Sequence, residues 1–497
     1  MRLAARRALS LALPLAAGLL ALAYLALLWS LDALPLGDLP NHLARATISA
    51  DLLFHGGQRF GLGYQLHLAP VPYVLGDVAL AGLVEWLGPY GAGRLWACLV
   101  AAAPPAAAAV YLRLVGFTPR GVLLGALLSL YLSTDWFFVN GFGHYRLAIA
   151  LTLLATAAWQ RFLRGGAPLA WACYAALLLA GYLMHLSALL FSGMSAVVTA
   201  AVALHFRETS ARRAASGALP FGALGIWHLY ASGPNPGGGR LFLLSPARKA
   251  LAAASPFLRY DLASEGALLL VFLLACALLA RGLGAARRDP RAVTFAALCL
   301  ASLALYAVLP HSRGSVAYVD VRAIPFAALF AVFGALAVAE RRASPPRLAA
   351  ALAVALAAGN LALLAAHLRP ANAEMRAYRA LAATVPTGAV VLPVATRPRD
   401  GRSNPFLHAG TLATIEAGAS TPYLFAGGVT TYFRALDRPR APSEFWYQEG
   451  GDAGDAATLA RTYAFCLVMV PFDASRLPVR TEEVARNGSA ALLAVVR

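Results

Sequence analysis

The feature that most constrains this sequence is a series of long apolar runs, rich in Ala, Leu, Val and Phe and separated by short groups of Arg. Of its residues 60% are hydrophobic and only 13% are charged, whereas a soluble protein carries about 25% charge. Such runs are typical of helices that cross a bilayer. The first, from Ala8 to Trp29, exceeds the roughly 7–15 apolar residues of a cleaved signal. We therefore expect an integral membrane protein whose first span is retained.

The basic residues predict the orientation of the spans. The net charge is +18, but nucleic-acid binders gather their base on one accessible face, and here Arg lies in short loops between apolar runs. Every such group falls on one side if the N-terminus is cytoplasmic, as the positive-inside rule requires. We thus expect no nucleic-acid partner. The predicted spans, about eleven by this reasoning, are 8–30, 92–114, 121–137, 145–163, 168–184, 187–205, 216–232, 264–281, 292–310, 323–340 and 347–367.

The segment between the first two spans, 31–91, is predicted to be a long extracytoplasmic loop with interfacial helices. Its stretch 71–88 is apolar but contains Asp77 and Glu85. Counting it as a span would move five Arg groups outside, so we expect it to lie at the interface or to be re-entrant. The stretch NHLARATISADLLF predicts an amphipathic helix on the membrane surface. One of its faces carries His42, Arg45 and Ser49.

The C-terminal part has a different pattern. The runs GAVVLPV, FCLVMVP and ALLAVVR are short and bounded by Gly, Pro or polar residues, which favours strands. Three intervening stretches favour helices, namely MRAYRALAATV, HAGTLATIEAG and DAATLARTYA. The predicted fold is an all-α polytopic transmembrane bundle over 1–368, followed by a small extracytoplasmic α/β domain over 369–497.

Polar residues next to apolar spans are costly and therefore informative. In this sequence most of them fall at the outer ends of the predicted spans. Four groups share that side, so we expect them to meet over one cavity. They are Gly37–His42, Ser133–Trp136 with Asn140–Arg146, His185, and His311–Arg313 with Tyr318–Arg322.

With these groups in place, the chain resembles the GT-C superfamily of membrane glycosyltransferases, which includes protein mannosyltransferases and aminoarabinose transferases. The resemblance covers a first span, a long first outer loop that opens with the acidic Asp38, a second outer loop with Asp135, many spans and an outer C-terminal domain. The segment D-x-P-N-H-x-x-R after the first span, here from Asp38 to Arg45, also looks like that of uncharacterised bacterial relatives. Leu39 and Pro40 stand where the better-known members often carry a second acid.

The resemblance implies a hexosyl- or pentosyltransferase. A sugar on a polyprenyl phosphate would be transferred to a glycan, lipid or protein acceptor, with help from a divalent metal, Mg or Mn. Asp38 matches the first-loop acid and would be the general base. Asp135 matches the second-loop acid, and both carboxylates would be metal ligands. The residues implied in binding substrate or donor phosphate are His42, Arg45, Arg146, Arg313 and Arg322.

Most of these residues also have a structural interpretation. Arg146, with His144 and Tyr145, could anchor a helix at the interface, and Arg322 could form a local ion pair with Asp320. Asp38 precedes Leu39-Pro40 and a helix, so it could serve only as an N-cap. His42 and Arg45 could form a solvated stripe, and Asp135 could mark the interfacial end of a span. His185 could be a hydrogen-bonded interhelical residue.

Two other functions remain open at this stage. A lipid or glycan transporter coupled to protons would carry carboxylates in mid-span, and the sequence offers essentially none. A non-catalytic scaffold of envelope assembly would explain the absence of a second acid beside Asp38. The abundance of Ala and Arg favours a GC-rich bacterial genome and hence a bacterial plasma membrane.

Overall fold

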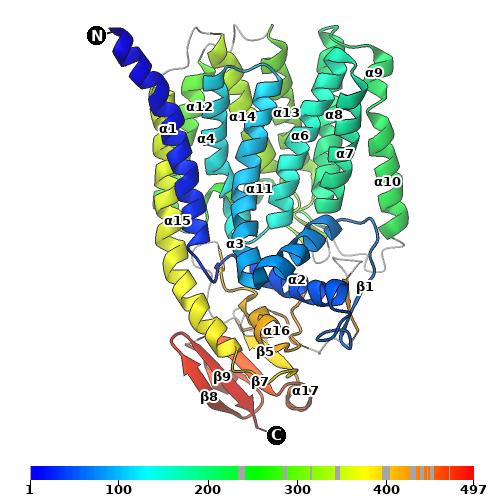
Figure 1. The fold of residues 1–497 in the computed structure, drawn as a ribbon, viewed down its shortest axis with the longest axis vertical. Coiled ribbons are helices and arrows are strands. Elements are labelled where there is room, and N and C mark those ends of the chain that lie inside the picture. Colours follow the sequence, from blue (N-terminus) through cyan, green and yellow to red (C-terminus); the bar gives the residue numbers. More distant parts are fainter. Residues whose placement is uncertain are drawn as a thin grey trace.

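The computed structural model describes residues 2–232, 241–281, 284, 288–313, 316–341, 347–394, 403–425, 433–436, 441–444, 446–447, 453–469 and 471–496. A bundle of long helices forms the larger part (Figure 1). The N-terminus lies at one end of this bundle and a small domain with the C-terminus lies at the other (Figure 1). The predicted fold class, a helical membrane bundle with a small α/β C-terminal domain, is confirmed.

Each predicted span coincides with a helix. The helices are α1 (Arg2–Trp29), α3 (Val74–Leu114), α4 (Pro119–Ser133), α6 (Gly143–Gly165), α7 (Pro168–Met184), α8 (Leu186–His205), α10 (Ala218–Ser232), α12 (Leu262–Ala280), α13 (Pro290–Val308), α14 (Ala323–Glu340) and α15 (Arg347–Ala382). Within the described residues, seven helices are long and apolar enough to cross a membrane. The chain is thus an integral membrane protein, and the number of eleven spans stays a prediction.

The helices differ in how much of their apolar surface the protein itself covers. In the most apolar stretch of α14, 78% of the residues are buried, against 28% in α12. Leu270 and Leu273 of α12 point outward with more than half of their surface exposed. An apolar face left open in this way is expected where lipid is the solvent, so α14 is central and α12 peripheral.

Helix α3 consists of two parts. Gly88 has φ 69 and ψ 166, which is not helical, and Pro89 follows it. The part before Gly88 packs beside α2 (Leu39–Phe54) and crosses the end of the bundle, while the part after it enters the bundle (Figure 1). Most of the stretch 71–88, from Val74 up to the break at Gly88, is therefore a helix separate from the span, as its acidic residues indicated.

Helix α2 is confirmed as a helix, but its polar face is not solvated. His42, Arg45 and Ser49 are 5%, 1% and 3% exposed. The helix packs against α3 on one side and against α16 (Leu412–Ala417) and η3 (Ala409–Thr411) of the C-terminal domain on another. The interpretation of His42 and Arg45 as a solvated stripe is thus wrong, because α3 and α6 cover this face: Arg45 pairs with Asp77, and His42 lies beside His144. The position of α2 at the membrane surface stays a prediction.

The C-terminal domain contains a four-stranded sheet in the order β5 (Val391–Val394), β7 (Phe465–Met469), β9 (Ala490–Val495) and β8 (Thr481–Asn487). The first pair is parallel and the other two are antiparallel. Helices α16 and α17 (Ala456–Thr462) complete it. Three of the four strands were predicted. The sequence missed β8 because this edge strand is mostly exposed and reads TEEVARN, without an apolar run.

The domain and the bundle are joined at several places. Helix α15 runs through the predicted boundary at 368 and 369 without a break, so no linker lies there. Strand β1 (Tyr64–Leu66) of the segment between α2 and α3 pairs with β6 (Phe433–Ala435) of the C-terminal part. A further small sheet, β2 (Leu241–Phe242), β3 (Ser312–Arg313) and β4 (Val316–Ala317), links two other loops at this end of the bundle. These loops and the C-terminal domain thus form one layer over the end of the bundle.

Candidate functional site

A cavity of about 190 Å³ lies between the end of the bundle and this layer. All four polar groups that the sequence singled out contribute to its walls, so their predicted convergence is confirmed. The side chains that surround the cavity are Asp38, His42, Arg45, Tyr73, Phe142, His144, Tyr145, His185, Val316, Ala317, Tyr318, Arg322 and Phe425.

Asp38 is held at the cavity by contact between the loop that precedes α2 and the loop that precedes α6. Its backbone N–H donates to the carbonyl of Asn140 at 2.9 Å, and that of Gly37 donates to Val139 at 3.1 Å. Gly141 has φ +81, and a Cβ there would lie 2.6 Å from the Asp38 nitrogen. Only glycine permits this close approach together with a left-handed backbone, so Gly141 allows the two loops to meet.

The Asp38 carboxylate does not act as a helix cap. Asp38 occupies the N-cap position of α2, yet its side chain makes no capping hydrogen bond. Its Oδ1 lies 3.3 Å from Nε2 of His408, a residue of the C-terminal domain, and 16% of the side chain is exposed. The interpretation of Asp38 as a cap alone is therefore wrong, and its carboxylate is available to the cavity.

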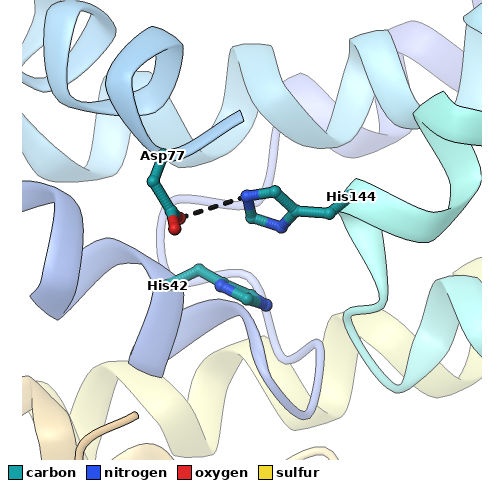
Figure 2. Close-up of side chains that lie close together, drawn as sticks. All are labelled: His42, Asp77 and His144. Carbon is teal, nitrogen blue, oxygen red and sulfur yellow. Dashed lines mark ion pairs between the residues drawn. The ribbon is translucent and has the colours of Figure 1, made fainter. Parts of the chain in front are cut away.

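Three buried side chains of types that can bind a metal lie together beside the cavity, namely His42 of α2, Asp77 of α3 and His144 of α6. Their ligating atoms all lie within 4.8 Å of one another. His144 Nε2 is 3.1 Å from Asp77 Oδ1, and Figure 2 shows the His42 ring beside this pair. Gly76 makes room for the group, because a Cβ there would lie 2.6 Å from His144 Nε2.

The chemistry of this group suits a divalent cation. Burial, together with the positive charges around it, lowers the pKa of His42 well below its usual value, so its ring is neutral and offers a lone pair. Nδ1 of His42 and Nδ1 of His144 are buried, and neither has a hydrogen-bond partner in the part of the chain that the structure describes. Two imidazoles and one carboxylate are a donor set typical of zinc.

Arg45 forms a buried ion pair with Asp77 and also reaches the cavity wall. Its charge is matched by that carboxylate. By contrast, Arg322 at the start of α14 has no carboxylate within ion-pair distance among the residues described, and its Nε has no hydrogen-bond partner there. The Phe142 and Tyr145 rings flank its guanidinium at 5.7 and 5.9 Å. Arg322 is thus the cationic wall residue best able to receive an anion.

His185 and Tyr73 complete the wall opposite Asp38. His185 Nδ1 accepts from the Ser187 backbone N–H at 3.1 Å, and its Nε2 lies 3.1 Å from the Tyr73 hydroxyl. His185 is therefore a hydrogen-bonded residue between two helices, as one interpretation of the sequence held. Tyr73 and Tyr318 adopt φ of 75 and 59. Positive φ is uncommon for such residues and concentrates at functional sites.

Two predicted site residues form a pair away from the cavity. Asp135 accepts from the Phe138 backbone N–H at 3.1 Å and pairs with Arg146 at 2.9 Å. Arg146 also donates to the Leu132 carbonyl at 2.8 Å. Both side chains are buried and neither belongs to the cavity wall. Their charges are matched locally, and their roles in metal and phosphate binding stay predictions.

The remaining predictions concern Arg313 and the metal roles of Asp38 and Asp135. Arg313 is exposed on β3 and does not reach the cavity, so its role in phosphate binding stays a prediction. Asp38 and Asp135 do not belong to the group of metal-ligating residues found in the described chain. Reasoning from the sequence missed Asp77 and His144 as candidate metal ligands, although the position of Asp77 in an apolar stretch was a signal. It also missed His408, which no pattern marks.

The comparisons with known proteins agree with this architecture. No family model and no curated protein matches the sequence. The chain does match solved structures of ArnT from Cupriavidus metallidurans, one in the apo state and one bound to undecaprenyl phosphate. The TM-scores are 0.60 and 0.58, at 13% identity over 96% of this chain and 97% of each ArnT chain. ArnT is an aminoarabinose transferase with the GT-C fold, so the predicted GT-C fold is confirmed.

Proposed function

We propose that this chain, which has the GT-C fold, transfers a sugar from a polyprenyl-phosphate donor to an acceptor outside the cytoplasm. The observation that carries the proposal is one cavity whose wall contains both the Asp38 carboxylate and the Arg322 guanidinium. A base and an anion-binding group are the two elements that such a transfer needs. That ArnT, with the same fold, has been seen with undecaprenyl phosphate supports a polyprenyl-linked donor.

The expected orientation supports an extracytoplasmic site. The cavity lies at the end of the bundle that carries the C-terminal domain, whereas the basic helix α9 (Ala211–Ala215) lies at the N-terminal end (Figure 1). Arg212 and Arg213 of α9 belong on the cytoplasmic side by the positive-inside rule. The N-terminus would then be cytoplasmic and the C-terminal domain would face the outside of a bacterial plasma membrane.

In the proposed reaction, a hydroxyl or amide of the acceptor attacks C1 of the sugar. The new bond to C1 forms as the bond between C1 and the phosphate oxygen breaks, and the polyprenyl phosphate leaves with the electron pair. Asp38 takes the proton that the acceptor releases. Arg322 binds the phosphate, because a guanidinium offers a planar pair of donors to its oxygens.

We further propose that His42, Asp77 and His144 hold a divalent cation. The neutral ring of His42 and the two Nδ1 atoms without described partners support this. Imidazole ligands favour zinc over the magnesium or manganese expected from the resemblance. When bound, the cation would supply positive charge close to the donor phosphate. The purified protein should contain zinc close to one ion per chain, and His144→Ala should lose it while the control His228→Ala, outside the cavity wall, retains it. Equal metal content in the two variants would contradict this site.

The function is tested with purified protein in nanodiscs and labelled polyprenyl-phosphate sugars. We expect transfer by the original protein and a loss of about 100-fold or more in Asp38→Asn. The matched control is Asp261→Asn, because Asp261 caps α12 by a bond to Ser264 and lies outside the cavity wall. Asparagine remains a good N-cap, so this control should keep full activity.

The other outcomes point to the alternative functions. Donor binding without transfer by the original protein would support a non-catalytic scaffold. Movement of the labelled lipid between leaflets without transfer would support a transporter. Either result contradicts the proposed enzyme.

A further inference from the structure

We propose that the C-terminal domain belongs to the catalytic centre, with His408 as a positioning residue that holds the base Asp38 and is itself held by Glu444. The inference rests on the proposed function, because it takes Asp38 as the base. It assigns to the C-terminal domain a part in the reaction beyond covering the loops.

The geometry is a continuous chain of three ionisable side chains. His408 Nε2 lies 3.3 Å from Asp38 Oδ1, and His408 Nδ1 lies 2.7 Å from Glu444 Oε1. The His408 side chain is 4% exposed, and those of Asp38 and Glu444 are 16% and 20% exposed. Both nitrogens of the imidazole thus face a carboxylate, and the ring is fixed between two elements of the chain.

The charges of this chain are matched as well. Burial by itself would lower the pKa of His408, but the Glu444 and Asp38 carboxylates raise it to about 10. At neutral pH the ring is therefore an imidazolium, and each of its nitrogens lies at ion-pair distance from a carboxylate. Opposite charges this close attract one another more strongly in a buried site than in water.

As a consequence, the Asp38 carboxylate is held by one oxygen, and its other oxygen can accept a proton. Oδ1 lies 3.3 Å from His408 Nε2, while Oδ2 makes no hydrogen bond or ion pair with any residue that the structure describes. A general base must be held within reach of its proton, and a displacement of about 1 Å can cost about 100-fold in rate. His408 would supply this constraint from the side of the C-terminal domain.

Attachment of the domain does not need this chain of charges. Asn41 already donates to the Tyr423 carbonyl at 2.8 Å and accepts from the Phe425 backbone N–H at 2.8 Å. Arg59 donates to the Ile415 carbonyl at 3.0 Å, and β1 pairs with β6. Burying charged groups costs desolvation that uncharged contacts avoid. A position next to the cavity carboxylate therefore favours a role in the reaction.

The test compares Glu444→Gln and His408→Gln with Glu416→Gln in nanodiscs. Glu416 is the matched control, because its carboxylate also joins the domain to the bundle, through Tyr90 and Arg379, but outside the cavity of Asp38. We expect kcat to fall about 10- to 100-fold in the first two variants. The affinity for sugar-free polyprenyl phosphate should change by less than about twofold, since neither residue touches the donor. Glu416→Gln should keep kcat.

Each result decides between distinct conclusions. An unchanged kcat in Glu444→Gln and His408→Gln, with activity lost in Asp38→Asn, would overturn this inference and leave the proposed function standing. Transfer by Asp38→Asn at the original rate would overturn both. An equal fall of kcat in all three Gln variants would mean that the domain only braces the loops. If His408→Gln fails to fold, Glu444→Gln decides, because it keeps the size of the side chain and an acceptor oxygen.

Discussion

Replacement of Arg322 by alanine tests the donor site most directly, because no carboxylate of the described residues pairs with this arginine and would lose its partner. Among the described residues its contacts are weak ones, namely 3.3 Å to the Ala317 carbonyl, 3.4 Å to His185 Nε2 and the two flanking rings. A cation–π contact of this kind contributes about 0.5–1 kcal/mol. The loss of folding stability in Arg322→Ala should therefore be small.

The loss of donor affinity should be larger. A hydrogen bond to a charged group contributes about 1.5–3 kcal/mol, and about 1.4 kcal/mol corresponds to a tenfold change in Kd. We thus expect Arg322→Ala to weaken the binding of polyprenyl phosphate by about 10- to 100-fold. Arg322→Lys should fall in between, because it keeps the charge and loses the planar pair of donors.

The assay is the binding of labelled polyprenyl phosphate to the protein in nanodiscs, with thermal unfolding measured on the same samples. Arg248→Ala is the control, since Arg248 is an exposed arginine of α11 (Pro246–Ala252) outside the cavity wall. If Arg322→Ala binds the lipid as the original protein does, the phosphate site is not at Arg322 and the reasoning from unmatched charge is refuted.

Other perturbations reach the metal group, the buried ion pair and the C-terminal histidine. Gly76→Ala places a Cβ 2.6 Å from His144 Nε2, so the purified variant should lose bound zinc in elemental analysis; full metal content would contradict the proposed ligands. In protein stripped of metal, Arg45→Met leaves a buried carboxylate of α3 without its counter-charge and should lower the free energy of unfolding by about 3–5 kcal/mol; an unchanged midpoint of thermal unfolding would show that the pair is not needed. The pKa of His408 is raised to about 10, so its stabilising effect is complete below the unfolded value of about 6.5 and is lost as the pH rises toward 10. The unfolding midpoint should fall over that window in the original protein and stay flat there in His408→Gln.

The helices of the bundle could be predicted because lipid imposes its requirement on every one of them. A chain that crosses hydrocarbon must satisfy its backbone within a helix and present apolar side chains, and each predicted span coincides with a helix. Because of the same requirement, the sequence does not show which helices are buried inside the bundle. Helices α12 and α14 are similarly apolar, yet one is mostly exposed and the other mostly buried, since lipid and protein interior accept the same residues.

The meeting of the outer loops was predictable, but the pairing of their charges was not. Polar residues at one end of several spans must share a limited area, and they line one cavity. Which carboxylate meets which cation depends on side-chain positions that the spacing does not set. Asp135 and Arg146, predicted for the site, pair with each other. Asp77, expected only at the interface, pairs with Arg45 and lies beside His144.

His408 and Glu444 were beyond the reach of sequence reasoning for a different physical reason. Inside and beside the membrane a polar side chain costs free energy, so its presence is itself a signal. In a domain that contacts water, an exposed histidine or glutamate costs no free energy. The presence of such a residue there therefore does not indicate a functional site. Only the fold reveals that His408 is buried between two carboxylates. The part of such a site that lies next to the membrane can therefore be found in the sequence, because polar residues there cost free energy. The part that the aqueous domain contributes can be recognised only from its contacts in the structure.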